Sequence, residues 1–417
     1  MVLASGNYTP CPREAVDYWL AGGGEIPMDE RNVEFTDKKM IVGTGAYLLK
    51  EWERKKKIVL VRNPDYRLEL YPSSGDETAR KLGLLKDAGK RLPIIDMCHY
   101  DYVPEFYTSW MLFLTGRSDA SGIPQEAYAS FITPDMKLSK KWEKDQQIYL
   151  RMAWTPTIYW LTFNMNDKVI GASKSLRQAM CLCFDIKSYL KVLFNDRGRR
   201  ARSIVPENFE GFVPGPYFRL DMKLAMEKIA LAKEELRAKG LLDENGQIPQ
   251  ITIDSDDHII NKRIGNFAMQ QFAKIGVRIK LQMMDWPTLQ ERVQTKKSQM
   301  YMMGWVSDYY DAENFLQLFY SPNITAGTNG ANYSNPQFDR LYEKIRVMPD
   351  SPQRTELYKK MVQMVCEDCP VLPLTEPLTL VLLHDWYENY RMMPIGAGYG
   401  KFRNTNVELR KKFGGRR

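Results

Sequence analysis

Short apolar runs alternate with longer amphipathic stretches through the second half of the chain. Ile251–Asp254, Val277–Met283 and Met300–Val306 have the length and composition of buried strands. Met222–Gly240 and Asn261–Lys274 carry apolar residues at helical spacing, and glycine closes the first of them. Because helices that alternate with strands cover the faces of a sheet, this part of the chain is predicted to form an α/β lobe with a largely parallel sheet.

The first half has the pattern of a β-hairpin. Two alternating runs, Ala46–Trp52 and Ile58–Arg62, flank the charged turn Glu53–Lys57. Ile94–Tyr102 is a further predicted strand, and Pro104–Gly116 is a predicted amphipathic helix.

Three later segments complete the expected elements. Leu176–Phe194 is predicted to be one continuous helix, because its apolar residues recur at helical spacing. Ser351–Glu367 is predicted to be a long helix, and Val371–Leu374 a strand that follows it.

The most informative stretch is Gln299–Tyr320, where a predicted buried strand meets a predicted helix. The junction gathers polar and aromatic side chains: Trp305, Ser307, Asp308, Tyr309, Tyr310 and Asp311. A carboxylate beside aromatic rings is suited to hold an ammonium group, because the acid supplies charge and the rings supply cation–π contact. We therefore predict that Asp308 binds an ammonium group between Trp305 and Tyr309. The alternative is structural, with Asp308 as a turn acid and Asp311 as a helix N-cap.

The composition limits the class of protein. The chain has 417 residues, of which 44% are hydrophobic, so it can build a large core in more than one lobe. The formal net charge of +8 is carried by scattered or terminal basic residues, which argues against nucleic-acid binding. No apolar run approaches the roughly 18 residues that a membrane-spanning helix needs.

Metal and redox sites have little support. The three histidines are isolated, and Cys366 and Cys369 form a single C-x-x-C motif with neither a second pair nor a nearby histidine. We expect no metal and no cofactor. A local disulfide between these two cysteines stays open, while Cys181 and Cys183 are expected to be core residues of a helix.

Two further features allow more than one interpretation. The arginines of Arg197–Arg202 could bind an acidic ligand group or belong to a solvated loop. Asp308 and Asp311 could serve as the two carboxylates of a glycoside hydrolase. However, the hydrolase signatures G-x-S-x-G and H-E-x-x-H are absent, so we expect a binding protein and not an enzyme.

Several blocks of the sequence resemble one family of receptors. GWVSDYYDAENF, residues 304–315, resembles the G-W-x-x-D-x-x-(D/E)-P-x-x-F region of family 5 of the extracytoplasmic solute-binding proteins, with Ala312 in place of proline. These are the peptide, oligopeptide and nickel receptors of ABC importers. Four other segments resemble further blocks of the family and occur in the family's order: Ile41–Asp65, Leu176–Asp185, Arg197–Pro206 and Asn332–Asp339.

The resemblance implies an α/β, periplasmic-binding-protein-like fold of two lobes joined by a hinge (type II, cluster C-like). The expected division is 1–153 for an incomplete lobe I, 154–375 for lobe II, and 376–417 for the return to lobe I. It also implies a receptor that binds short peptides between its lobes and delivers them to a membrane permease and its ATPase subunits.

The resemblance also assigns the ligand-binding residues. In the peptide-binding members, the acid three residues after the tryptophan binds the peptide α-amino group, and here that acid is Asp308. The ligand site is then expected to comprise Ser307, Asp308, Trp305, Tyr309 and Tyr310. A nickel chelate, a sugar or another cationic solute is the alternative ligand, and a sensor or scaffold would differ only in its downstream partner.

The start of the chain carries its own expectation. Met1–Gly6 lacks the basic start and apolar core of a signal peptide. Tyr8–Val16 instead resembles an internal stretch of lobe I of the family. We therefore expect the signal sequence and part of lobe I to lie upstream of Met1, and the protein to work in the periplasm or otherwise outside the cytoplasm.

Overall fold

The computed structural model describes residues 43–145, 147–393, 395 and 399–413. The chain divides into two compact units. Unit 1 comprises Met1–Ala153 and Leu380–Arg417, and unit 2 comprises Trp154–Thr379. The stretch Tyr8–Val16 lies outside the described residues.

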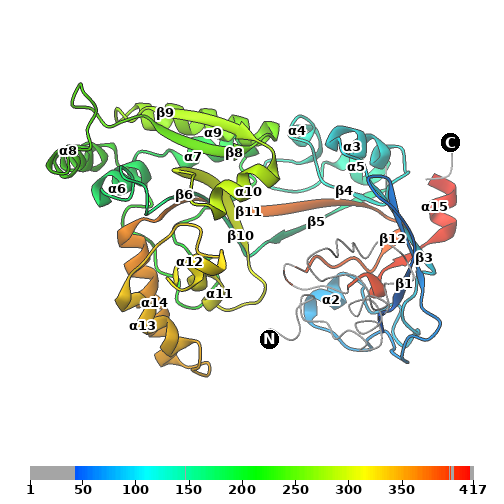
Figure 1. Cartoon of the computed structure of the whole chain (residues 1–417). Helices are drawn as coiled ribbons and strands as arrows, with labels where there is room; N and C mark the ends of the chain where they lie inside the picture. The colour runs from blue at the N-terminus through cyan, green and yellow to red at the C-terminus, as the bar shows by residue number, and fades with distance from the viewer. Residues whose placement is uncertain (1–42, 146, 394, 396–398, 414–417) are drawn as a thin grey trace, which may run out of the picture. The chain divides into compact units, whose positions relative to one another are not determined.

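Unit 1 contains the predicted hairpin (Figure 1). β1 (Tyr47–Glu53) pairs antiparallel with β2 (Lys57–Arg62), and β2 pairs antiparallel with β3 (Met97–Asp101), which confirms these strands. The predicted amphipathic helix is also present, as α3 (Phe106–Leu114). The remaining elements of unit 1 are α2 (Glu77–Lys81), β4 (Ala120–Ser121), α4 (Tyr128–Phe131), α5 (Lys140–Asp145), β5 (Ile148–Trp154), β12 (Tyr387–Glu388), η5 (Tyr399–Phe402), β13 (Asn404–Thr405) and α15 (Val407–Phe413).

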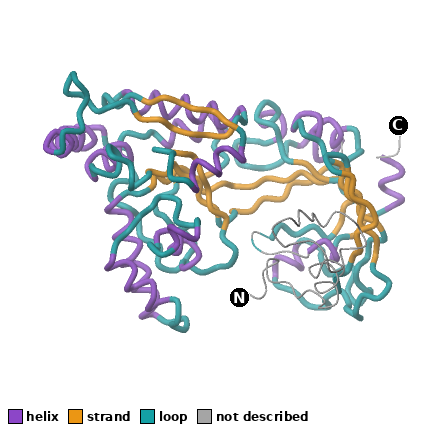
Figure 2. Tube along the Cα trace, viewed as in Figure 1, coloured by secondary structure: helices purple, strands orange, loops and turns teal. Residues whose placement is uncertain are grey.

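Unit 2 is built on a mixed sheet in the order β7–β11–β6–β10–β8–β9. Its strands are drawn in orange in Figure 2. Its strands are β6 (Thr157–Phe163), β7 (Gly198–Arg200), β8 (Ile251–Asp256), β9 (Ile279–Met284), β10 (Met300–Val306) and β11 (Val371–His384). β8, β9 and β10 pair in parallel, whereas β6, β7 and β11 join the sheet antiparallel. The expected parallel sheet therefore exists on one side only, in β8, β9 and β10, because β6, β7 and β11 on the other side pair antiparallel.

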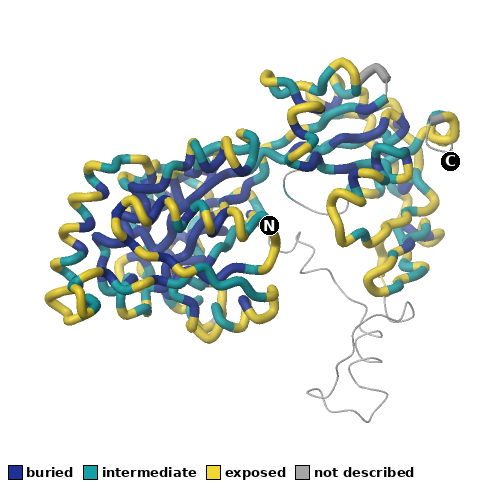
Figure 3. The backbone as a smooth tube through the Cα atoms, turned by 90° about the horizontal axis from the view of Figure 1, so that it is seen from above, coloured by how far each residue is buried: buried dark blue, intermediate teal, exposed yellow. Residues whose placement is uncertain are grey.

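Helices and loops surround this sheet and enclose one large core. The helices are α6 (Lys174–Leu182), α7 (Ile186–Phe194), α8 (Met222–Ala238), α9 (Ile259–Ala273), α10 (Trp286–Gln294), α11 (Glu313–Leu316), η4 (Gln317–Phe319), α12 (Asn323–Ala326), α13 (Pro336–Ile345) and α14 (Pro352–Asp368). Figure 3 shows buried residues concentrated in the interior of this unit and exposed residues along its outside. In the described part of the chain, no helix has both the length and the apolar character needed to cross a bilayer.

The prediction of one helix over Leu176–Phe194 is wrong, because the segment forms α6 and α7 with a break between them. Asp185 lies at the break and acts as the N-cap of α7, with its carboxylate accepting a hydrogen bond from the Ser188 amide at 3.1 Å. The short polar side chain competes with the helical backbone bond, so the chain restarts a helix here although its apolar spacing is continuous.

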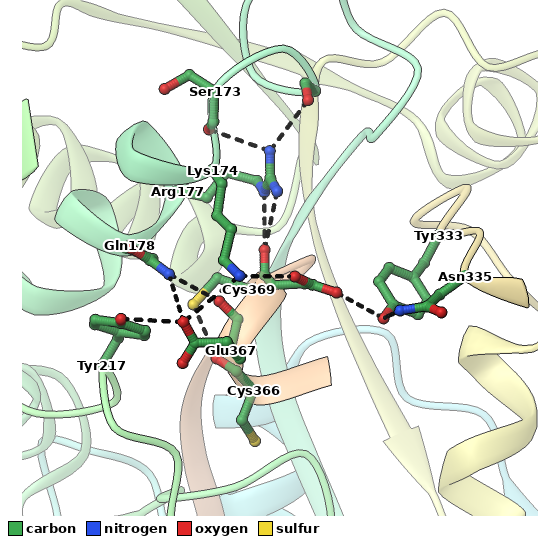
Figure 4. Close-up of polar contacts among 12 residues, drawn as sticks. Ser173, Lys174, Arg177, Gln178, Tyr217, Tyr333, Asn335, Cys366, Glu367 and Cys369 are labelled. Atoms are coloured by element: carbon green, nitrogen blue, oxygen red, sulfur yellow. Dashed lines mark hydrogen bonds and ion pairs between the residues drawn. The ribbon is translucent and has the colours of Figure 1, made fainter. Parts of the chain in front are cut away.

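A polar network joins α6 to the end of α14 (Figure 4). The buried Arg177 guanidinium donates to the Asp368 carbonyl oxygen from Nε at 3.1 Å and from Nη2 at 3.0 Å. Nη1 donates to the Ile170 carbonyl oxygen at 2.8 Å. Arg177 therefore satisfies main-chain carbonyl groups and has a structural role.

The C-x-x-C motif does not form a disulfide in this structure. Cys366 and Cys369 carry free thiols, and Figure 4 shows their sulfur atoms pointing in different directions. Cys369 caps α14 with a positive φ of 47°, and its Sγ contacts the Cys366 carbonyl oxygen at 3.1 Å. Cys181 and Cys183 are fully buried, as expected.

Candidate functional site

The predicted site segment leaves the sheet at the end of β10. Val306, the last residue of this strand, pairs with Thr157 at the start of β6. The next amide, that of Ser307, donates to the Pro156 carbonyl oxygen at 2.9 Å. The base of the Ser307–Tyr310 segment is therefore fixed by the main chain of the neighbouring strand.

Asn314 connects two of the predicted residues. Its Oδ1 accepts hydrogen bonds from Trp305 Nε1 at 2.8 Å and from the Asp308 amide at 3.2 Å. Its Nδ2 donates to Asp308 Oδ2 at 3.3 Å. Asn314 is only 1% exposed, whereas Asp308 is exposed. The buried Asn314 amide thus orients the exposed Asp308 carboxylate, which can still accept hydrogen bonds from a cationic group.

Asn314 is not among the residues predicted from the sequence to form the ligand site. Asparagine in a predicted helix carries no signal of its own, and its function here depends on a turn that brings it back to the end of β10. The pattern of residue types offered no means of finding it.

The remaining predicted residues have different surroundings. Ser307 is buried, and its Oγ donates to the Tyr309 carbonyl oxygen at 2.5 Å, so it braces the turn. Tyr309 donates its hydroxyl proton to Glu313 Oε2 at 2.6 Å. Burial and this hydrogen bond raise the pKa of Tyr309 well above its ordinary value, so the phenol stays a donor. Tyr310 is exposed, and its ring packs against Phe209 with centroids 5.5 Å apart.

Asp311 forms an ion pair with a residue of α14 and is not part of the candidate site. Its Oδ2 lies 2.8 Å from Arg354 Nη1, and its Oδ1 accepts from the Tyr358 hydroxyl at 2.6 Å. The predicted N-cap role is wrong by one residue, since Ala312 occupies the cap position of α11, although Asp311 Oδ1 accepts from the Glu313 amide at 2.9 Å. With Asp311 engaged by a cation on α14, the arrangement gives no support to the two-carboxylate hydrolase.

The arginine-rich segment is partly neutralised by acids. Arg199 donates to Glu376 Oε2 from Nε at 3.0 Å and from Nη2 at 2.6 Å, and its Nη1 lies 3.0 Å from Glu207 Oε2. Burial raises the pKa of Glu376 although Arg199 opposes that shift. Arg202 also pairs with Glu207, and the Arg199 guanidinium lies 4.9 Å from the centroid of the Trp154 ring. This segment is therefore an ion-pair cluster and not a simple solvated loop.

Two other kinds of site do not involve these residues. A cavity of about 230 Å³ lies in unit 1 and contains none of the predicted site residues. It is lined by Tyr71, Pro72, Ser74, Gly75, Ala79, Leu84, Leu85, Asn389, Arg391, Met393, Tyr399, Phe402 and Arg403. Among the residues that the structure describes, no group of three or more His, Cys, Asp or Glu side chains is placed to hold a metal ion.

Comparison with known families decides the wider assignment. Residues 9–327 match the model described as bacterial extracellular solute-binding proteins, family 5 middle. The chain belongs to this family. Among its curated relatives, the oligopeptide-binding protein OppA of Bacillus subtilis is 25% identical over 330 residues, which cover 78% of this chain and 57% of OppA. The chain thus spans less than two thirds of the length of that family member.

Solved structures of similar proteins share the fold. The periplasmic binding protein DppA of Helicobacter pylori, in complex with the peptide STSA, matches with a TM-score of 0.67 and 21% identity, covering 87% of this chain and 63% of DppA. AppA of Bacillus subtilis, in complex with a nonapeptide, matches with a TM-score of 0.68 and 21% identity, covering 92% of this chain and 69% of AppA. These matches confirm the expected α/β solute-binding-protein fold.

Proposed function

We propose that this chain is the peptide-binding component of an ABC importer and that Asp308 anchors the α-ammonium group of the ligand. The observation that carries the proposal is the exposed Asp308 carboxylate, oriented by the buried Asn314 beside Trp305. Membership of family 5 and the peptide-binding relatives support the same ligand class. The other three residues of the site would contribute a brace, Ser307, and aromatic walls, Tyr309 and Tyr310.

The proposed mechanism is binding without chemistry. A desolvated ammonium–carboxylate pair fixes one end of the peptide, and strand-like main-chain hydrogen bonds accept varied side chains. Closure of two lobes around the ligand is the movement that periplasmic binding proteins use, and the closed form would engage the permease and its ATPase subunits. The same proposal places the protein outside the cytoplasm, in keeping with the description of its family.

A thermal melt with and without a pool of short peptides tests the receptor function. A ligand that binds only the folded state raises the unfolding midpoint by mass action. We expect an upward shift with peptides that have a free amino terminus and a smaller shift with their N-acetylated forms. If no peptide shifts the midpoint, while a sugar or a nickel chelate does, the protein is a receptor for another solute.

Asp308→Asn tests the anchor separately. We expect the affinity for free-amine peptides to fall at least tenfold, which corresponds to about 1.4 kcal/mol, and the affinity for N-acetylated peptides to change little. Asp257→Asn, which alters an exposed acid in the loop after β8, is the matched control and should bind as the wild type does. Equal affinity of Asp308→Asn and wild type would remove the anchor role and leave the receptor function standing.

A further inference from the structure

One arginine of the Arg197–Arg202 segment lacks the partners that the others have. Arg197 donates from Nε to the Phe194 carbonyl oxygen at 3.0 Å, and Arg199 and Arg202 form the ion pairs described above. The main chain of Arg200 pairs with Thr375 of β11, but its guanidinium forms no hydrogen bond or ion pair within the described part of the chain. Its Nε is buried without a partner.

The register of the sheet places Arg200 in a row of side chains on one face. Arg200 pairs with Thr375 of β11, Thr375 pairs with Tyr159 of β6, and Tyr159 pairs with Gly304 of β10. Directly paired residues of neighbouring strands point to the same side of a sheet. Tyr159 is 47% exposed, and a Cβ on Gly304 would lie 2.5 Å from its ring, so glycine leaves the space that the ring occupies.

The charge of Arg200 is held in unfavourable surroundings. Burial lowers the pKa of its guanidinium to about 10, although the nearby Cys181 and Asp185 oppose this shift. The Asp185 carboxylate is already bonded to the Ser188 amide and hydroxyl, the latter at 2.7 Å. Arg200 therefore stays positively charged at neutral pH, and a cation partly withdrawn from water is costly unless an anion meets it.

We propose that Arg200 binds a carboxylate of the ligand, with Tyr159 as the adjoining wall. The inference rests on the proposed peptide-binding function and adds a second, anionic point of recognition. A guanidinium recognises a carboxylate through two parallel hydrogen bonds, and this geometry requires donors that no other acid already occupies. The carboxylate is either the C-terminus of the peptide or an acidic side chain within it.

The strand spacing guides the choice of probe. Arg200 and Gly304 lie three strands apart, on the order of 14 Å at about 4.8 Å per strand. Because an extended chain spans up to about 3.4 Å per residue, a pentapeptide is long enough to cover this distance and is a suitable probe.

The test is isothermal titration of the 417-residue chain with pentaalanine as the free acid and as the C-terminal amide. If Arg200 meets the C-terminus, the wild type should bind the acid at least tenfold more tightly than the amide; if it meets an acidic side chain, the two should bind alike and the glutamate probe below should show the preference. Arg200→Met should reduce this ratio to about one by weakening the acid alone. Arg202→Met, which alters a more exposed arginine paired with Glu207, is the matched control and should keep the wild-type ratio.

A second pair of probes identifies which carboxylate Arg200 meets. Both are amidated pentapeptides, with glutamate or glutamine at the central position and alanine elsewhere. A preference for glutamate that Arg200→Met removes assigns the site to an acidic side chain. A preference confined to the free-acid pentaalanine assigns it to the C-terminus.

Folding is measured on the same variants, because a structural arginine would also lower affinity when removed. Arg200→Met deletes an unpaired charge, so its thermal midpoint should equal or exceed that of the wild type. Peptide binding without any preference for a carboxylate, or a clear fall in the midpoint of Arg200→Met, overturns the inference and leaves the proposed function intact. If the wild type binds no peptide, the proposed function fails and this inference fails with it.

Discussion

At the scale of single residues, two acids three positions apart have different surroundings. Asp308 is exposed and held by a neutral amide, whereas the side chains of Asp311 and Arg354 are only 12% and 11% exposed and form an ion pair. In the local sequence, both residues are simply acids of the same predicted turn. Arg354 of α14, more than forty residues further along the chain, pairs with Asp311 and gives it a structural role. Asp308 has no such partner among the described residues and stays the candidate ligand group.

Asp311→Ala should therefore lower the free energy of unfolding, because Asp311 has a structural role and is not part of the proposed ligand site. Removing one partner of a buried ion pair costs about 3–5 kcal/mol, and we expect about 3 kcal/mol because Arg354 keeps Asp350 as a partner at 2.6 Å. Urea unfolding measures this loss. Asp350→Ala removes the exposed partner and should cost less than about 1 kcal/mol. Equal stabilities of the two variants would contradict the assignment.

At the scale of secondary-structure elements, capping and pairing change what apolar spacing predicts. The spacing of Leu176–Phe194 is continuous, yet Asp185 divides the segment into α6 and α7. β10 has the predicted bounds, Met300–Val306, because its run of apolar residues ends abruptly at Ser307. Elements defined by local signals were predicted well, and those that depend on competition between a side chain and the backbone were not.

Asp185→Ala should destabilise α7 by about 0.5–2 kcal/mol, the usual cost of losing an N-cap, whereas Asp185→Asn should cost less. Urea unfolding of the three proteins near neutral pH measures the difference. A loss for the alanine variant no larger than that for the asparagine variant would contradict the capping role.

The same position has a predictable pH dependence. Burial raises the pKa of Asp185, but the hydrogen bonds from Ser188 outweigh it and hold the pKa below its ordinary 3.8. A carboxylate with a depressed folded-state pKa stabilises the protein above the unfolded-state value, and that contribution is lost as the pH falls through the folded-state pKa. The advantage of wild type over Asp185→Asn should therefore shrink in acid below about pH 4. A constant difference across this range would contradict the assignment.

At the scale of the whole molecule, the two units differ in how they bury their sheets. The strands of unit 2 lie within one large core. The β1–β3 sheet of unit 1 leaves large apolar side chains exposed, including Trp52, Met97 and Tyr100. The units should therefore open with different free energies.

Hydrogen exchange followed by mass spectrometry tests this difference. Amides of β6 and β10 should exchange more slowly than those of β2, because opening a strand in a deep core costs more free energy than opening one with an exposed face. The two sets are matched, since β2, β6 and β10 each have a paired strand on both sides. Equal protection in both sets would indicate that the two units open as one cooperative body.

The sequence by itself determined the local elements, the family resemblance and the grouping of Trp305, Ser307, Asp308 and Tyr309 around one turn. Those features depend on neighbouring residues, whose spacing and chemistry can be read directly. Only the tertiary structure decided that Asn314 orients Asp308, that Arg354 pairs with Asp311, and that Arg200 Nε is left without a hydrogen-bond partner within the residues that the structure describes. These outcomes depend on which groups distant in sequence meet after folding, since burial and pairing of a charge are properties of its surroundings and not of its residue type.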